Sequence, residues 1–272
     1  MAKVKYRSIF ISDVHLGTKD SQADYLLDFL KNTESDYLYL IGDIFDIWKM
    51  KSGWHWPQIN SNIVQNILYK AKTGTQVVYI PGNHDERLRD YVGTMFYGVA
   101  IAGDHLHDTA DGKRLLLIHG DEFDGLVMTN PWLVRLGDWS YIACLWLNRQ
   151  FNRFRKQFGF PYWSLSRYLK CRMKNAMEHI SRYVNACISE TRRRGYDGIV
   201  CGHIHHADIK SIDGILYCNT GDWVENCTAL TEDRQGRLSI IRWVEESTRL
   251  MSESDVDGIG IPEVEAIARK AA

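Results

Sequence analysis

The chain has 272 residues, of which 45% are hydrophobic and only 5 are proline, so it can bury a substantial core and does not resemble a disordered protein. Its formal net charge of −1 conceals an uneven distribution, because residues 149–194 carry twelve lysines and arginines against two glutamates. A near-neutral chain is not typical of nucleic-acid-binding domains, which are often markedly basic. The basic stretch is interpreted either as a solvated helix face or as part of a binding surface.

The six cysteines form no C-x-x-C pair and are spread along the chain, so we expect them to be reduced and mostly buried. Met1–Arg7 shows no secretory pattern and leads directly into a predicted strand. The longest apolar run, Trp139–Leu147, is too short to cross a bilayer. These features predict a cytoplasmic protein and leave open peripheral contact with the inner face of the cell membrane.

In chain order, the first part of the sequence alternates between strand and helix patterns. It predicts strands at Ser8–Ser12, Tyr37–Ile41, Gln76–Ile80, Arg114–Ile118 and Ile199–Cys201, and helices at Gln22–Leu30 and Gln58–Lys70. The last part predicts strands joined by short turns, at Ile209–Ile212, Ile215–Asn219, Cys227–Leu230 and Leu238–Trp243. Alternating elements followed by hairpins indicate a layered α/β sandwich with a mixed sheet.

One segment interrupts this alternation. Residues 130–194 have a helical pattern rich in tryptophan, tyrosine, phenylalanine and arginine, so we interpret them as a helical insertion between two strands. The core is then predicted to comprise residues 1–129 and 195–250. Residues 251–272 are expected to form an acidic C-terminal tail.

Polar motifs follow five of the predicted strands. In chain order they are Asp13-Val14-His15, Gly42-Asp43, Gly82-Asn83-His84-Asp85, His119-Gly120-Asp121 and Gly202-His203-Ile204-His205. Because ligands bind outside the carboxyl ends of strands in open α/β sheets, we expect these motifs to converge on one site. Glycines beside them allow the backbone to turn sharply and approach closely.

The residue types in these motifs suit divalent metal ions, since they offer carboxylate, amide and imidazole ligands and no thiolate. Asp13 and His15 are two residues apart just beyond a strand, and His203 and His205 have the same spacing. A shared carboxylate, for which Asp43 is the candidate, can bridge two ions about 3.5–4 Å apart. The sequence therefore predicts two divalent ions per chain. We expect manganese, although iron, zinc and magnesium accept the same ligands.

Other histidines lack this context. His105-Leu106-His107 has the same spacing as a ligand pair, but no strand followed by glycine precedes it. We expect this pair, together with His55 and His179, to be structural or solvent-facing.

The ordered series D-x-H, G-D, G-N-H-D, H-G-D and G-H-x-H resembles the calcineurin-like metallophosphoesterase superfamily from Ser8 to about Trp243. This resemblance implies a four-layer αββα sandwich with mixed sheets. It also implies that one ion is held by Asp13, His15, Asp43 and His205. The second ion would be held by Asp43, Asn83, His119 and His203.

The resemblance further places His84 beside the scissile phosphate, with Asp85 orienting it. The implied reaction is direct hydrolysis of a phosphoester by a hydroxide that bridges the two ions, without a phospho-enzyme. The ions would offset the charge that develops on the phosphate, and a protonated His84 would assist the leaving group.

A narrower resemblance is carried by residues 42–48 and 119–123, by Asn130-Pro131-Trp132-Leu133, and by Thr220-Gly221-Asp222-Trp223. These stretches are similar to the UDP-2,3-diacylglucosamine pyrophosphatases of lipid A biosynthesis and their paralogues. In that family a helical lid occupies the position of the predicted insertion, and basic residues meet the diphosphate. The resemblance implies a lipid-linked nucleotide substrate, peripheral membrane contact and substrate contacts from Asn130, Trp132, Arg149 and Arg153.

Two motifs depart from this narrower family. Its members typically carry Asn-Arg-Asp where this chain has Asn83-His84-Asp85, and His-Thr-His where it has His203-Ile204-His205. A related lipid-linked nucleotide diphosphate is therefore an alternative substrate. A phosphodiesterase or nuclease of the same superfamily is the alternative enzyme, because basic and aromatic residues also bind single strands. A non-catalytic scaffold would require lost ligands, whereas every expected ligand is present.

Overall fold

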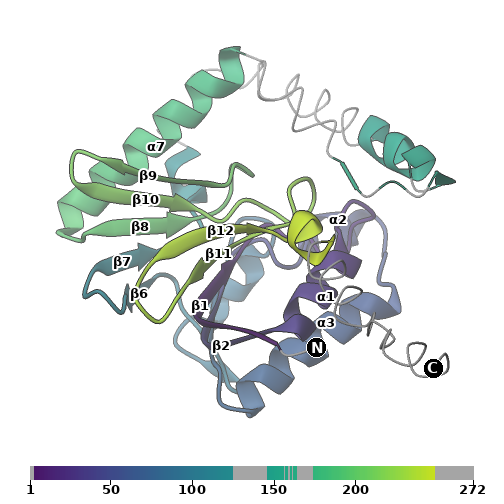
Figure 1. Cartoon of the computed structure of the whole chain (residues 1–272), viewed down its shortest axis with the longest axis horizontal. Coiled ribbons are helices and arrows are strands. Elements are labelled where there is room, and N and C mark those ends of the chain that lie inside the picture. Colours follow the sequence, from purple (N-terminus) through teal and green to yellow (C-terminus); the bar gives the residue numbers. More distant parts are fainter. Residues whose placement is uncertain are drawn as a thin grey trace, which may run out of the picture.

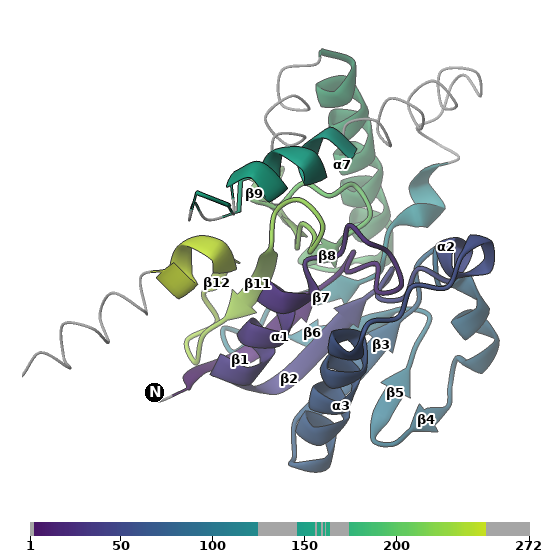
Figure 2. The same ribbon diagram turned by 90° about the vertical axis from the view of Figure 1, so that its right-hand side faces the viewer.

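The computed structural model describes residues 3–124, 146–155, 157–158, 160, 162–163 and 174–248. Two mixed sheets face each other and are flanked by helices on their outer sides (Figures 1 and 2). The predicted acidic tail, and most of the predicted insertion before residue 174, lie outside the described residues.

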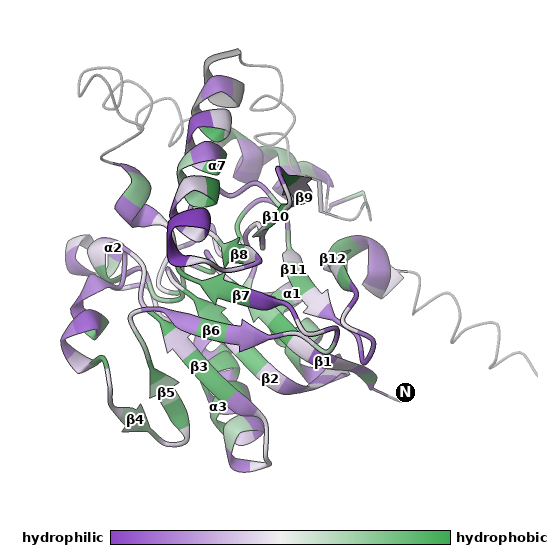
Figure 3. Ribbon diagram, turned by 90° about the vertical axis from the view of Figure 1, so that its left-hand side faces the viewer, coloured by the Kyte–Doolittle hydropathy of each residue, from purple (hydrophilic) through white to green (hydrophobic). Residues whose placement is uncertain are grey.

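The larger sheet has seven strands in the order β12-β11-β1-β2-β3-β5-β4. Strands β1, β2, β3 and β5 run parallel, whereas β11, β12 and β4 are antiparallel to their neighbours. The second halves of the central strands are buried and mainly apolar, because both faces of the sheet are covered there (Figure 3). Its strands are β1 (Val4–Ile11), β2 (Thr33–Ile41), β3 (Gln76–Ile80), β4 (Met95–Phe96), β5 (Val99–Ile101), β11 (Thr228–Glu232) and β12 (Leu238–Arg242).

The smaller sheet has five strands in the order β6-β7-β8-β10-β9. Its three central strands are parallel and its two edge strands are antiparallel to them. Its strands are β6 (His105–Asp108), β7 (Arg114–Leu117), β8 (Gly198–Cys201), β9 (Asp208–Ile212) and β10 (Ile215–Asn219).

The longer helices form the two outer layers. Helices α1 (Ala23–Asn32) and α3 (Gln58–Lys72) cover the larger sheet, and α7 (Lys174–Arg194) covers the smaller one. Between the sheets lies a third apolar cluster, which includes Phe10 and Leu117. The predicted four-layer αββα sandwich with mixed sheets is therefore confirmed. Shorter elements are α2 (Ile47–Ser52) and the 3₁₀ turns η1 (Glu86–Tyr91) and η2 (Asp121–Phe123).

Helix α7 forms the last part of the predicted insertion and packs on the smaller sheet. The boundaries of the insertion itself stay a prediction. Tyr183, Val184 and Cys187 of this helix are buried against the smaller sheet. The last third of residues 130–194 is therefore a layer of the core. Many of its arginines pair with acids, as in the 2.6 Å contact between Arg182 and Glu178, which agrees with a solvated helix face.

Burial agrees with one other expectation. The cysteines within the described residues, Cys187, Cys201, Cys218 and Cys227, are free and buried, whereas Cys144 and Cys171 lie outside that part of the chain. No helix among the described residues is long and apolar enough to span a bilayer.

Candidate metal centre

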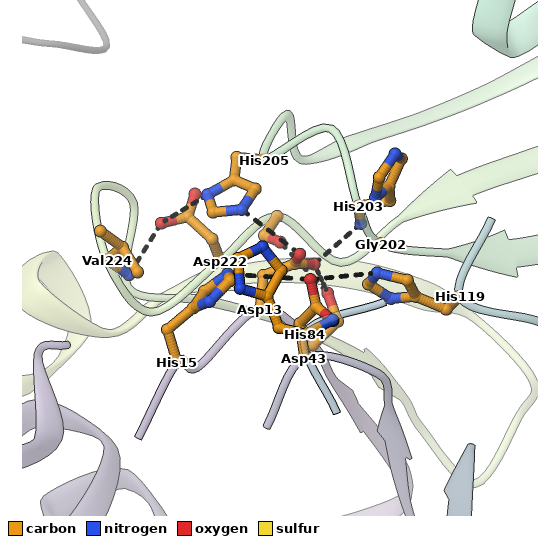
Figure 4. Close-up of polar contacts among 12 residues, drawn as sticks. Asp13, His15, Asp43, His84, His119, Gly202, His203, His205, Asp222 and Val224 are labelled. Atoms are coloured by element: carbon orange, nitrogen blue, oxygen red, sulfur yellow. Dashed lines mark hydrogen bonds and ion pairs between the residues drawn. The ribbon is translucent and has the colours of Figure 1, made fainter. Parts of the chain in front are cut away.

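The carboxyl ends of strands from both sheets bring the predicted ligands to one site (Figure 4). The loop after β1 lies beside the loop after β2, because the amide of Asp13 donates to the carbonyl of Gly42 at 3.1 Å. The loop after β7 is joined to the loop after β8 in the same way, by a 3.1 Å hydrogen bond from Gly202 to His119. Parallel neighbours thus deliver their polar residues in pairs.

The backbone at this site is strained. A positive φ is uncommon for residues other than glycine and costs roughly 1–3 kcal/mol, and it persists mainly where function requires it. The predicted ligands that adopt it are Asp13 (51°), His15 (52°), Asp43 (54°), His203 (70°) and His205 (52°).

Asp43 lies at the centre of the site. Its Oδ1 accepts a 2.8 Å hydrogen bond from the amide of His84. Its Oδ2 lies 3.3 Å from His119 Nε2 and 4.0 Å from His15 Nε2, so one oxygen faces a histidine on each side (Figure 4). This is the arrangement expected of a carboxylate shared by two ions.

Glycine is required beside Asp43. A Cβ on Gly82 would lie 2.3 Å from Asp43 Oδ1, and a Cβ on Gly42 would lie 2.2 Å from His119 Nδ1. The expected close approach of these two glycines to the ligands is thus observed.

On one side of Asp43, the ligand atoms of Asp13, His15 and His205 lie within 4.8 Å of one another. Asp13 Oδ1 is 3.3 Å from His205 Nε2, while Asp13 Oδ2 accepts hydrogen bonds from Ser12 Oγ and from the amide of His203. One oxygen of Asp13 is held by the protein and the other faces the site.

On the other side, the ligand atoms of Asp43, His119 and His203 lie within 4.8 Å of one another. His119 Nδ1 lies 2.9 Å from the carbonyl of Ile41, and this contact turns Nε2 toward Asp43. His203 Nε2 is 2.8 Å from Asp124 Oδ1, which leaves Nδ1 as the ring atom available to an ion. Together these two groups contain the aspartates and histidines among the predicted ligands, with Asp43 next to both.

Several buried atoms at this site have no hydrogen-bond partner. Such atoms are costly unless an ion, water or ligand satisfies them. They include Asp13 Oδ1, His15 Nε2, Asn83 Oδ1 and His119 Nε2, which come from four of the predicted ligands. The residues therefore fit two divalent ions with oxygen and imidazole ligands.

The electrostatic environment also favours cations. Burial alone would lower the pKa of His15, but its contact with Asp46 and the charges of Asp43 and Asp13 raise that pKa to about 9. Burial alone would raise the pKa of Asp13, but the neighbouring His205 and His119 hold it at about 2. The electrostatic potential at the site is thus negative and stabilises a positive charge. A bound metal ion would supply this charge in place of the proton on the histidine.

His84 lies at the edge of the site and has a partner that the sequence did not reveal. Its Nδ1 is 3.1 Å from Asp46 Oδ1, and the other oxygen of Asp46 is 3.2 Å from His15 Nδ1. Asp46 also caps α2 by accepting from the amide of Lys49 at 2.8 Å. The ring of Trp48 lies over His84 with a centroid separation of 4.5 Å. One carboxylate thus orients both a predicted ligand and the predicted catalytic histidine.

The expectation that Asp85 orients His84 is wrong. Asp85 is fully buried, and its oxygens accept hydrogen bonds from Tyr79 Oη and from the amides of Gly82, Asp43, Ile44 and Phe45. These five donors account for both oxygens of the carboxylate. Asp85 instead fixes the loop that carries Asp43, and Asp46 takes the role expected of it.

Asp222 is another residue whose role was missed. It is fully buried, it accepts from the amides of Val224 (2.8 Å) and Asn226 (3.2 Å), and its Oδ1 lies 3.9 Å from His205 Nδ1. The Thr220-Gly221-Asp222-Trp223 motif pointed to this residue only through the family resemblance. Tyr183 of α7 completes the support, since its hydroxyl lies 3.4 Å from the carbonyls of both His119 and Gly202.

The histidines that were not predicted to be ligands have other surroundings. His107 is buried between the sheets, where its Nε2 is 2.9 Å from Glu232 and its Nδ1 is 2.9 Å from Tyr39 Oη. The expectation that it is structural is therefore confirmed. His179 has no described side chain, and His55 lines the groove beside the site.

A groove of about 610 Å³ opens from the site and is lined by His15, His84, His205, Trp48, Lys49 and Arg149. Arg149 pairs with Asp20 at 3.0 Å and also lines a second cavity of about 810 Å³. Arg153 and the aromatic residues Tyr25, Trp146, Phe160 and Tyr162 line that second cavity. Arg149 and Arg153 thus lie on a path that leads away from the centre. Asn130 and Trp132 lie outside the described residues.

Residues 6–207 match the family model of calcineurin-like phosphoesterases. The chain therefore belongs to the calcineurin-like phosphoesterase family, and its class is that of metal-dependent phosphoester hydrolases.

Within that class, the chain is similar to proteins named UDP-2,3-diacylglucosamine hydrolase. The one from Psychromonas ingrahamii is 30% identical over 118 residues, which cover 42% of this chain and 47% of the relative. The one from Haemophilus influenzae is 24% identical over 254 residues, which cover 86% of this chain and 98% of the relative. The chain thus spans about half the length of the first relative and nearly all of the second.

Two solved structures are also similar. A novel archaeal phosphodiesterase has 14% identity and a TM-score of 0.41, with 86% of this chain and 98% of that chain covered. A hypothetical protein from Pyrococcus horikoshii has 11% identity and a TM-score of 0.47, with 92% and 94% covered.

Proposed function

We propose that this protein hydrolyses a phosphoester directly at a centre of two divalent ions. The observation that carries the proposal is the position of Asp43, whose free oxygen faces His119 and His15 between two groups of ligand atoms. Asp13, His15, Asp43 and His205 would hold one ion. Asp43, Asn83, His119 and His203 would hold the other, and manganese is the metal that we propose.

When bound, the two ions supply a deprotonated water near neutral pH and positive charge beside the phosphate. The remaining work belongs to the protein. Asp46 holds His84 at the rim of the groove, where the imidazole can donate a proton to the leaving oxygen. Lys49 and Arg149 line the same groove and would balance the charge of a second phosphate.

We propose that the substrate is UDP-2,3-diacylglucosamine or a related lipid-linked nucleotide diphosphate. The proteins of that name in two bacteria support this substrate class, as does the shape of the cavities. Three basic side chains, Lys19, Lys49 and Arg149, line the groove at the centre. The adjoining cavity is lined partly by Tyr25, Trp146 and Phe160. A charged diphosphate followed by an apolar group would meet matching surfaces, and the lid and the membrane contact belong to the same proposal.

The experiment measures release of UMP from UDP-2,3-diacylglucosamine in detergent with added manganese. A soluble diester, bis-p-nitrophenyl phosphate, is tested in parallel. Wild type is compared with Asp43→Ala, His84→Ala and Arg149→Ala. The control for His84→Ala is His105→Ala, because His105 lies on β6 outside the site.

We expect Asp43→Ala to lose activity toward both compounds and His84→Ala to lower kcat by roughly 10²–10⁴-fold, the usual contribution of a general acid. Arg149→Ala should raise KM for the lipid substrate and leave the soluble diester unaffected. If only the soluble diester is hydrolysed, the proposal of a lipid-linked substrate is refuted, whereas the proposal of a two-ion centre is still supported. Full activity of Asp43→Ala would refute the two-ion proposal. A salt-sensitive nuclease activity would show that the substrate is a nucleic acid instead of a lipid-linked nucleotide.

A further inference from the structure

A third cavity, of about 730 Å³, lies at the opposite end of the larger sheet from the metal centre. It is formed where β1, β2 and β3 begin and where α1 and α3 end, near the N-terminus marked in Figures 1 and 2. Strand β2 connects the two ends, since Ser35 lines this cavity and Asp43 follows the same strand. At about 3.3 Å per residue the two sites are roughly 26 Å apart, so they are separate.

The cavity is positively charged. Five basic side chains line it against two acidic ones, Glu34 and Asp36. Both acids are already paired: Lys3 lies 3.1 Å from Glu34, and Arg234 lies 2.9 Å from Asp36. The basic residues are Lys3, Lys5, Lys31, Lys70 and Arg234.

Within the described part of the chain, two of these cations form no direct ion pair, although the charge of Glu34 still acts on Lys70. Among the described residues, neither Lys31 nor Lys70 forms an ion pair with a carboxylate. Lys70 is only 7% exposed, and its ammonium donates to the carbonyl of Thr33 at 2.6 Å. A buried ammonium is costly unless it is paired, so an anion beside it would be stabilised. Burial lowers the pKa of Lys70 to about 8, which still leaves it mostly charged at neutral pH.

The same cavity contains two buried polar atoms that lack a partner, Ser35 Oγ and Asn66 Oδ1. A hydroxyl and an amide oxygen can accept hydrogen bonds from a ligand, and the hydroxyl can also donate one. These atoms are a second and independent sign of a ligand, because buried polar groups are normally satisfied.

We propose that this cavity binds a phosphorylated organic molecule of about nucleotide size. Its phosphate would pair with Lys70 and Lys31, and its hydroxyl groups would satisfy Ser35 and Asn66. The volume falls within the usual range for small-molecule sites, roughly 300–1,000 Å³. Tyr37 and Tyr69 add aromatic surface to the walls.

The test uses isothermal titration calorimetry on the full chain carrying Asp43→Ala, so that binding at the metal centre does not contribute. UMP is the probe, and inorganic phosphate is titrated separately. Lys70→Met is added to remove the buried charge, and Lys31→Ser to remove the exposed one. The matched control is Lys72→Ser. Lys72 lies on α3, as Lys70 does, and it is exposed, as Lys31 is, but it does not line the cavity.

We expect UMP to bind the Asp43→Ala protein. Lys70→Met should weaken that binding about tenfold or more, Lys31→Ser several-fold, and Lys72→Ser not at all. If Lys70→Met does not fold, the difference between Lys31→Ser and Lys72→Ser decides. Absence of UMP binding, equal affinity in all variants, or inorganic phosphate binding as tightly as UMP would each overturn the proposal. Because the metal centre is disabled throughout, failure here is distinct from failure of the hydrolase.

Discussion

Replacing Asp85 with asparagine tests how the loop that carries Asp43 is held. The carboxylate of Asp85 is surrounded only by donors, so the ionised form alone can satisfy all five contacts. An asparagine keeps one oxygen and turns an NH₂ group toward donors. If the asparagine oxygen takes the place of Asp85 Oδ2, which accepts from Ile44, the NH₂ group takes the place of Oδ1. It would then face the amides of Gly82 (2.6 Å) and Asp43 (3.3 Å).

The cost follows from these contacts. Each hydrogen bond to a charged acceptor contributes about 1.5–3 kcal/mol, so two lost bonds remove at least about 3 kcal/mol. That is a large share of the roughly 5–15 kcal/mol by which a domain is stable. Metal affinity should fall as well, because the amide of Asp43 is released and its carboxylate is displaced from His119 and His15.

The free energy of unfolding is measured by urea denaturation, and the bound metal by elemental analysis after dialysis. Tyr79→Phe is the matched control: it removes one donor to the same carboxylate and should cost about half as much. An Asp85→Asn protein with wild-type stability and two bound ions per chain would refute this account of the loop.

Three further outcomes are expected. Gly42→Ala places a methyl group against His119 at a φ of +75°, so elemental analysis should find close to one ion per chain instead of two. Burial alone would raise the pKa of Glu232, but its bonds to His107 and Ser8 hold it near 2, below its ordinary 4.5. Its contribution, roughly 3 kcal/mol, is present above pH 4.5 and lost as pH falls toward 2. Urea midpoints from pH 7 to 3 should therefore fall less steeply in Glu232→Gln, and equal slopes would contradict this. Chelation should abolish hydrolysis, manganese should restore it, and activity that survives chelation would exclude a metal mechanism.

The convergence of the proposed ligands was predictable because each follows a strand that has a clear apolar pattern. Parallel strands end at one edge, so the motifs of β1, β2 and β3 had to converge. The strained backbone of Asp13 or Asp43 carries no sequence signal of its own, although aspartate tolerates that conformation better than most residues.

The supporting residues could not be assigned from sequence, because their partners are distant in the chain. Asp85 binds amides about 40 residues earlier, and its neighbour His84 was the more obvious partner. The position of Asp46 just before α2 is typical of a helix cap. The sequence does not indicate that it also contacts His15 and His84. His107 was expected to be structural, but its partner Glu232, 125 residues later in the chain, could not be assigned from sequence.

Short edge elements were also missed. Strand β4 has two residues, and the turn that follows it is Tyr97-Gly98 instead of the usual Asn-Gly. Tyr97 adopts a φ of 49° there, which no propensity rule favours.

The proposed ligands come from both sheets, and this has a consequence for the stability of the whole molecule. Asp13 and Asp43 follow strands of the seven-stranded sheet, whereas His119 and His203 follow strands of the five-stranded one. A bound ion is therefore a cross-link between the two halves of the sandwich. By mass action, an ion at 100 times its dissociation constant adds about 2.7 kcal/mol to folding. The melting temperature should thus report the occupancy of the centre, and removal of the metal should make the protein more susceptible to proteolysis.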